Sequence, residues 1–117
     1  MILLICMVNA TLCTTNSDEP WAANVDFSVM SNSWSTQLDV KYQHYKNLCT
    51  NNHVVIVYKV LNLELIMKGV AKLTSIKDGR SLASITVTWL RLVENSTVSD
   101  FDSVDDITQL FITKQLD

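Results

Sequence analysis

Histidine and cysteine are the residues of this chain whose chemistry could bind a metal or attack a substrate. The 117-residue sequence has three cysteines, and Cys49 stands five residues after His44 and four before His53. A structural zinc site needs four ligands at a recognisable spacing, and nothing else in the chain supplies them. Three cysteines form no even disulfide set, so free thiols are expected. We therefore predict no metal and no cofactor, with both histidines at the surface.

Motifs for catalysis are absent from the sequence. It has no Gly-x-Ser-x-Gly elbow, no glycine-rich phosphate loop and no His-Glu-x-x-His pair. The adjacent Asp105 and Asp106 stand where a helix is expected to begin near Asp102 or Ser103, and the helix dipole favours carboxylates there. We interpret them as helix N-terminal residues and expect no enzymatic activity.

Charge is distributed unevenly along the chain. Residues 41–91 carry eight of the nine basic residues and two acids, whereas residues 1–40 and 92–117 are acidic. The central basic zone is either a solvated face or a surface for an anionic partner. The acidic C-terminal region is a candidate surface for a protein partner.

The stretch from Val54 to Ser75 is expected to organise the fold. Val54–Val60 is a run of β-branched and aromatic residues, and Ile66–Leu73 alternates with lysines on one face. The short link between these two strands predicts an antiparallel hairpin. Gly69 within the second strand predicts a bulge or the close approach of another backbone.

The whole chain, residues 1–117, is expected to form one α+β domain with a curved sheet of about five strands and two or three helices. The expected elements are strand, loop, helix, strand and acidic loop over residues 2–8, 11–24, 36–49, 85–93 and 94–102, followed by the last helix. The predicted core consists of Leu38, Tyr42, Tyr45, Val55, Val57, Ala71, Leu73, Val87, Trp89, Leu110 and Phe111.

A family resemblance rests on the order and spacing of several pieces. They are Ser-Trp-Ser-Thr at residues 33–36, an amphipathic helix, VVIVYKV, GVAKLTS and ITVTWLRLVENS. Together, over roughly Phe27 to Phe101, they resemble the YTH domain of the PUA-like superfamily, in a diverged or truncated form. The resemblance implies a PUA-like, barrel-like sheet with flanking helices that binds single-stranded RNA and takes N6-methyladenosine into an aromatic cage.

The resemblance also implies a site. Trp34 matches the first tryptophan of the cage, and Ser31 and Asn32 match polar contacts before it. The loop from Thr74 to Ser84 has no aromatic residue to form the second wall, so the cage is degenerate. Contacts to the RNA backbone are assigned to Lys41, Lys59, Lys68, Lys72, Lys77 and Arg80.

Two other functions remain open. The chain could be a protein-interaction module that kept the fold without RNA binding, with Trp34 serving only to pack the barrel mouth. It could also be a small secreted domain with glycans at Asn9 and Asn95, where the first residues serve as a signal peptide cleaved after Ala10. An intracellular location, nuclear or cytoplasmic, is the main expectation. The apolar start is too short to span a membrane.

Overall fold

The computed structural model describes residues 5–16 and 19–113 and is built mainly from strands. Its elements are β1 (Ile5–Asn16), β2 (Glu19–Met30), β3 (Ser33–Asp39), α1 (Gln43–Thr50), β4 (His53–Val60), β5 (Leu63–Leu73), β6 (Arg80–Glu94), β7 (Thr97–Phe101) and α2 (Val104–Thr113). Among the described residues, no helix is both long and apolar enough to cross a membrane.

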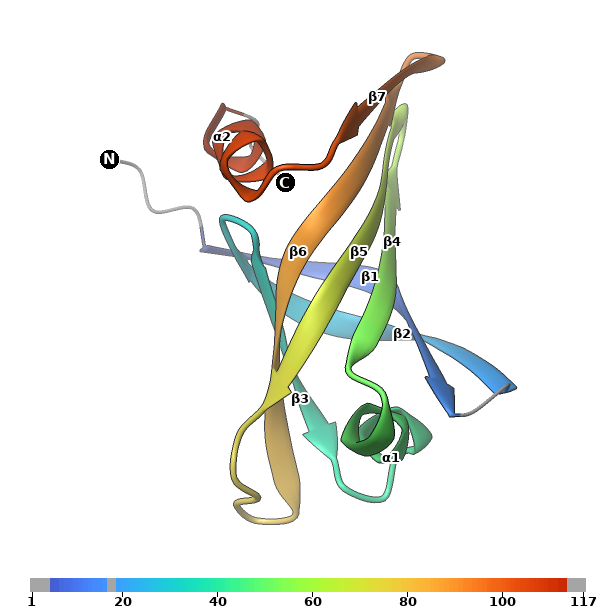
Figure 1. Ribbon diagram of the computed structural model, residues 1–117, viewed down its shortest axis with the longest axis vertical. Coiled ribbons are helices and arrows are strands. Elements are labelled where there is room, and N and C mark those ends of the chain that lie inside the picture. Colours follow the sequence, from blue (N-terminus) through green and yellow to red (C-terminus); the bar gives the residue numbers. More distant parts are fainter. Residues whose placement is uncertain (1–4, 17–18, 114–117) are drawn as a thin grey trace.

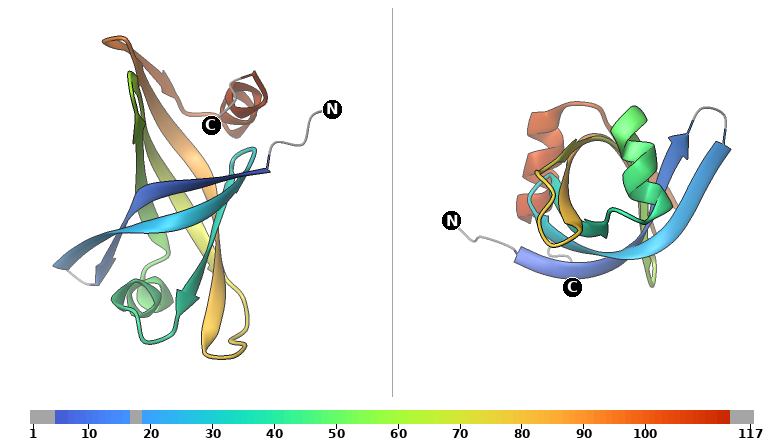
Figure 2. Two further views of the ribbon diagram at one scale, coloured as in Figure 1. Left: turned by 180° about the vertical axis from the view of Figure 1, so that it is seen from behind. Right: turned by 90° about the horizontal axis from the view of Figure 1, so that it is seen from below.

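The strands close into a barrel. They are hydrogen-bonded in the order β3-β2-β1-β4-β5-β6-β7, and β3 also pairs with β6. The first six strands therefore form an antiparallel ring, which is seen end-on in the right-hand view of Figure 2. Closure rests on short pairings at two points, residues 11–13 of β1 with β4 and residues 28–30 of β2 with β3, so the rest of the β1–β2 hairpin extends beyond the ring. The predicted barrel-like sheet with flanking helices is confirmed in this coarse form, with seven strands in place of about five.

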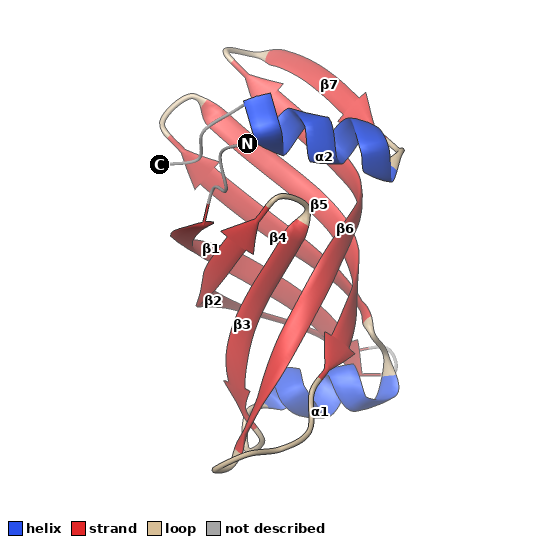
Figure 3. Ribbon diagram, turned by 90° about the vertical axis from the view of Figure 1, so that its left-hand side faces the viewer, coloured by secondary structure: helices blue, strands red, loops and turns tan. Residues whose placement is uncertain are grey.

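Strand β6 is long enough to serve two partners on one of its sides. Its first part, residues 80–86, pairs with β3, and its last part, residues 90–94, pairs with β7. The two helices lie at opposite ends of the barrel (Figures 1 and 3). One end of the molecule is therefore marked by α1 and the β5–β6 loop, and the other by α2 and β7.

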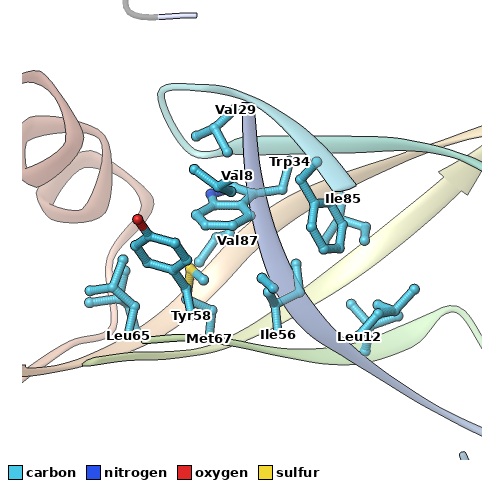
Figure 4. Close-up of a cluster of buried hydrophobic side chains, with 14 of the residues drawn as sticks. Val8, Leu12, Val29, Trp34, Ile56, Tyr58, Leu65, Met67, Ile85 and Val87 are labelled. Atoms are coloured by element: carbon cyan, nitrogen blue, oxygen red, sulfur yellow. The ribbon is translucent and has the colours of Figure 1, made fainter. Parts of the chain in front are cut away.

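The barrel interior is centred on Trp34, which is fully buried. Its ring lies 5.6 Å from Phe27, 6.1 Å from Tyr58 and 6.2 Å from Phe111, measured between ring centroids, at interplanar angles of 60–67°. Such tilted and edge-to-face contacts are the preferred packing of aromatic rings. Figure 4 shows this ring among aliphatic side chains that include Val8.

Gly69 in β5 permits a close approach between β5 and β6, as predicted. A Cβ atom at this position would lie 2.6 Å from Cγ2 of Ile85 and 2.8 Å from the carbonyl oxygen of Thr86. Both distances are too short for non-bonded atoms, so only glycine fits here without rearrangement.

A β-bulge accompanies this close approach and decides which residues of β6 face inward. Lys68 pairs with Trp89, but Gly69 pairs with Val87, which leaves Thr88 as an extra residue in β6. The extra residue shifts the alternation, so Val87 and Leu90 are buried while Trp89 lies on the outer face, half-buried. The prediction of Trp89 as a core residue is therefore wrong.

The predicted hairpin of residues 54–60 and 66–73 is confirmed by β4 and β5, in which residues 53–60 pair with residues 63–70. The predicted helix over residues 36–49 is wrong in its first part, because residues 33–39 form β3. There Trp34, Thr36 and Leu38 recur at every second position and are all buried, and this two-residue period prevails over the helical one. Only residues 43–50 are helical, ending before Asn51 as expected.

Two predicted loops are strands. Residues 11–24 belong largely to the β1–β2 hairpin, which stays polar because one face of each strand points to solvent. Residues 97–101 form β7 after a two-residue turn at Asn95 and Ser96, both with positive φ. The predicted first strand over residues 2–8 is borne out for residues 5–8, which begin β1; residues 2–4 lie outside the described part.

Apart from Trp89, the predicted core residues divide into four groups. Leu38, Ala71, Val87 and Phe111 are buried, and Tyr45, Leu73 and Leu110 pack partly against the core. Val55 and Val57 are half-buried on the outer face of β4, because Val54, Ile56 and Tyr58 take the interior positions. Tyr42 is 59% exposed, since it precedes α1 and does not belong to a helical stripe.

Candidate functional site

The residues predicted to hold a modified base do not form a pocket. The ring of Trp34 is enclosed by aromatic rings of its own chain and has no exposed surface. Ser31 and Asn32 form the β2–β3 turn, where the carbonyl oxygen of Asn32 accepts a hydrogen bond from the amide of Val87 at 2.9 Å. The ring of Trp34 therefore packs inside the barrel, and the turn joins β2 to β3 and bonds to β6, so neither offers a surface to a base.

The six basic residues predicted to contact RNA are dispersed over the barrel. Lys41, Lys72, Lys77 and Arg80 lie toward the end that carries α1 and the β5–β6 loop. Lys59 stands beside the β4–β5 turn at the opposite end, paired across the sheet with Glu64. Lys68 lies between these ends, on the outer face of β5.

A groove on the outer face of the sheet brings together residues from five strands, β1, β2, β4, β5 and β6. It has a volume of about 380 Å³ and we refer to it as the Trp89 groove. Its lining consists of Cys13, Thr14, Thr15, Pro20, Asn51, His53, Val54, Val55, Lys68, Gly69, Thr88 and Trp89. Lys68 and His53 supply basic groups, and the lining contains no carboxylate. The bulge at Thr88 creates this groove wall, because it turns the indole of Trp89 outward.

Two cations flank the indole. The Nζ atom of Lys68 lies 5.1 Å from the Trp89 ring centroid, and the guanidinium carbon of Arg91 lies 5.5 Å from it. Both are within the range of cation–π attraction. Arg91 also donates two hydrogen bonds to Asp100, at 2.8 and 3.0 Å, and this pairing raises the pKa of Arg91 and lowers the pKa of Asp100. The charge of Arg91 is therefore already paired with that of Asp100.

Lys68 differs from Arg91 in its pairing. Among the described residues, no carboxylate lies within ion-pair distance of its ammonium group. The ammonium group therefore stands at the groove with its charge offset only by the indole face. A flat ring that stacked on the indole would take the place that Lys68 now holds over it, and the displaced ammonium would then be available to pair with an acidic group of the same ligand.

The thiol in the groove is not an activated nucleophile. Burial raises the pKa of Cys13, so the thiol is protonated at neutral pH. His53, also in the lining, is exposed as predicted. In the described part of the chain, no three residues with metal-binding side chains gather around a common point.

His44 is not the surface residue that the sequence predicted. Only 3% of it is exposed, and its Nδ1 lies 2.8 Å from the hydroxyl oxygen of Thr14 on β1. Burial lowers the pKa of His44, because the charged imidazolium loses its hydration. The helix was predicted to begin earlier and to bury Tyr42, and that wrong phase placed His44 on the outside.

The sequence did contain one signal for the Trp89 groove. Gly69 was predicted to mark a bulge or the close approach of another backbone, and an extra residue in the facing strand reverses every later position of that strand. Applying this shift to residues 85–93 would have moved Trp89 to the outer face. The cross-strand neighbour of Trp89 is Lys68, and identifying it requires the register, which the sequence alone does not fix.

Structural comparison identifies the barrel. A putative pyridoxamine 5′-phosphate oxidase from Listeria innocua superposes with a TM-score of 0.66 at 16% identity, covering 75% of this chain and 89% of that one. A heme-binding protein from Mycobacterium smegmatis gives a TM-score of 0.74 at 16% identity, covering 86% of this chain and 55% of that one. General stress protein 26 from Bacillus anthracis gives 0.66 at 12% identity, covering 80% and 88%.

At the level of sequence, no family model and no curated protein matches this chain. The structural neighbours named here share the barrel fold of pyridoxamine 5′-phosphate oxidase-like proteins, and their names are not those of YTH domains. The resemblance to the YTH domain is therefore wrong, and with it the PUA-like assignment and the prediction of an N6-methyladenosine reader. The resemblance took Ser-Trp-Ser-Thr as the lead into a helix, whereas residues 33–39 form strand β3.

Proposed function

We propose that this chain binds a small, flat, conjugated molecule that carries an acidic group, and that it does so in the Trp89 groove. The observation that carries the proposal is the indole of Trp89 on the outer face beside the unpaired ammonium group of Lys68, in a lining without carboxylates. We assign binding to the groove and no reaction, in line with the expectation from the sequence.

The names of the structural neighbours support this ligand class. One neighbour is named for pyridoxamine 5′-phosphate, and another for heme. Both molecules combine a flat aromatic system with acidic groups, phosphate in one and carboxylates in the other. The groove volume of about 380 Å³ falls within the usual range of small-molecule sites.

Different residues of the groove would contact the flat ring and the acidic group of the ligand. The indole of Trp89 offers a face for stacking, while Val55 and Pro20 add apolar wall. Lys68 would hold the acidic group, with the hydroxyl of Thr88 close by in the lining.

For heme in particular, the lining offers His53 as its one imidazole. The thiol of Cys13 fits iron less well, because burial raises its pKa and keeps it protonated. A heme iron held here would therefore depend on His53, whereas a phosphorylated ring would not.

Binding assays with three probes test the proposal and separate the two ligand types. Pyridoxamine 5′-phosphate, flavin mononucleotide and hemin would each be titrated against the whole chain by equilibrium dialysis. We expect at least one to bind saturably, with Trp89→Leu weakening it by about tenfold or more, the usual worth of a lost aromatic stack. Lys68→Gln should weaken the acidic probes and leave a neutral, dephosphorylated analogue unaffected.

Matched controls come from the chain itself. Trp21 is an exposed tryptophan outside the groove lining, so Trp21→Leu should leave affinity unchanged. His53→Ala should weaken hemin alone. The proposal fails when none of the probes saturates, or when Trp21→Leu and Trp89→Leu have equal effects.

A further inference from the structure

A second concave site lies at the end of the barrel that carries α1, and it is separate from the Trp89 groove. The β5–β6 loop and the neighbouring strand β3 border an open surface hollow of about 700 Å³. Its lining is Gln37, Thr74, Ser75, Lys77, Asp78, Arg80 and Leu82, none of which lines the Trp89 groove. Along β5, Thr74 is roughly 17 Å from Gly69 at about 3.4 Å per residue.

The tip of this loop is a closed two-residue turn. The amide of Lys77 donates to the carbonyl of Arg80 at 2.8 Å, and the amide of Arg80 donates back to Lys77 at 3.0 Å. Between them, Asp78 and Gly79 have φ values of 54° and 73°, as a type I′ turn requires. The amide of Val40 donates to the carbonyl of Gly79 at 3.0 Å, which fastens the tip to the β3–α1 connection.

The base of the loop is fastened as well. The amide of Thr74 donates to the carbonyl of Leu82 at 3.0 Å, and the amide of Leu82 donates to the hydroxyl of Thr74 at 2.9 Å. The hydroxyl of Ser81 donates to the carbonyl of Thr74 at 2.7 Å. The loop is thus held at both ends, so the hollow keeps its shape without a ligand, as pre-formed ligand sites usually do.

Two cations, Lys77 and Arg80, and one carboxylate, Asp78, line the hollow, and the net charge of +1 favours an anion. Lys77 and Arg80 both line it, and within the described ranges neither has a carboxylate at ion-pair distance, Asp78 included. The hydroxyl of Ser75 and the side-chain amide of Gln37 add neutral donors, and neither takes part in a hydrogen bond to a charged group. The lining has no aromatic residue, so it offers no stacking surface for a flat ring.

We propose that this hollow binds the phosphate group of a soluble phosphate monoester. The guanidinium of Arg80 matches a phosphate in two-pronged geometry, and the ammonium of Lys77 adds a second positive charge for a dianion. Ser75 and Gln37 complete the set of donors. Lys41 and Lys72 stand at the same end of the barrel and raise its local potential.

Amide NMR of the isotopically labelled whole chain tests this site directly. Inorganic phosphate and glycerol 3-phosphate would be titrated in turn, with sulfate as the competing anion, at constant ionic strength. We expect saturable shifts confined to the amides of residues 74–82 and 37–41. The double variant Lys77→Gln/Arg80→Gln should weaken glycerol 3-phosphate by about tenfold or more, since two charged hydrogen-bonding groups are lost.

Two control variants keep the outcome clear. Lys72→Gln removes a cation from the same end of the barrel without altering the lining, so it should change the affinity by less than about twofold. Trp89→Leu should have no effect on the binding of glycerol 3-phosphate. A failure of the phosphate proposal can therefore be distinguished from a failure of the proposed ligand site in the Trp89 groove. Three outcomes would each overturn the proposal. The first is a set of chemical shifts that change linearly without saturation, and the second is equal binding of sulfate and phosphate, which would mean an adventitious ion only. The third is an equal loss of affinity in Lys72→Gln and in the double variant.

Discussion

The two helices close opposite ends of the barrel by different physical means. Helix α2 buries Ile107 and Phe111, and the ring of Phe111 packs against Trp34 at the centre of the core. Helix α1 buries His44, Asn47 and Leu48, of which only the last is apolar. One end of the molecule is therefore held by apolar contact and the other largely by hydrogen bonds.

The hydrogen bonds of α1 fix its position on one strand. The side-chain amide of Asn47 donates to the hydroxyl of Thr14 at 2.9 Å and accepts from Gln43 at 2.8 Å. Asn51, just after the helix, donates to the hydroxyl of Thr15 at 2.9 Å. Apolar contact is non-directional, whereas such bonds set register. Because Thr14, Thr15 and Asn51 also line the Trp89 groove, the polar end is the one that shapes the proposed site.

The largest expected effect is at the apolar end. Phe111→Ala should lower the free energy of unfolding by about 3–5 kcal/mol, because it opens a cavity beside Trp34. Chemical denaturation followed by fluorescence would measure the loss. The control is Ile112→Ala on the exposed side of α2, expected to cost within about 0.5 kcal/mol. Equal losses for the two variants would show that α2 does not seal the core.

Asn47→Ala should destabilise the polar end by less, about 1–3 kcal/mol, since it leaves the hydroxyl of Thr14 and the amide of Gln43 without this partner. Unlike Phe111→Ala, it should also weaken ligand binding in the Trp89 groove, because the α1 contacts position the lining. Lys46→Ala, an exposed neighbour on the same helix, is the matched control. A stability loss as large as that of Phe111→Ala would remove the contrast between the two ends.

The same contrast explains what the sequence could predict. Helix α2 was found because apolar residues recur at helical spacing after a capping serine, and burial then follows that stripe. The β4–β5 hairpin was found for a similar reason, since β-branched runs and a short link determine it locally. Both signals lie within one continuous stretch of the chain, at most the 22 residues from Val54 to Ser75, and depend on hydrophobicity.

The start of helix α1, its buried face and the Trp89 groove were missed because their determinants are not local. His44 is buried because Thr14, thirty residues away in sequence, supplies a partner. Trp89 points outward because a bulge opposite Gly69 shifts the register of two paired strands. Hydrophobic periodicity carries no information on the contact between His44 and Thr14 or on the register of β5 and β6. The polar face of α1 was therefore assigned to solvent.

A smaller effect concerns the start of α2. The hydroxyl of Ser103 accepts a hydrogen bond from the amide of Asp106 at 3.1 Å, which confirms the predicted N-cap. Ser103→Ala should cost about 1 kcal/mol in unfolding free energy, and Ser103→Asp should restore most of it. Thermal unfolding of both variants would check this. Loss of stability in the aspartate variant as well would point to a role for Ser103 other than capping.

The last effect is the dependence of the polar end on pH. Burial lowers the pKa of His44 in the folded chain, so the unfolded chain takes up the proton first as the pH falls. The stability contributed by neutral His44 is therefore complete above the unfolded pKa of about 6.5 and is lost as the pH drops below it toward the folded value. Urea unfolding at about pH 5 and about pH 8 should show a drop for the wild type that is smaller in His44→Gln, which has no imidazole to protonate. The exposed His53 is present in both proteins, so its contribution cancels in the comparison. An identical drop in the two proteins would show that His44 does not link α1 to pH, and the polar end would then differ from the apolar end only in its hydrogen bonds.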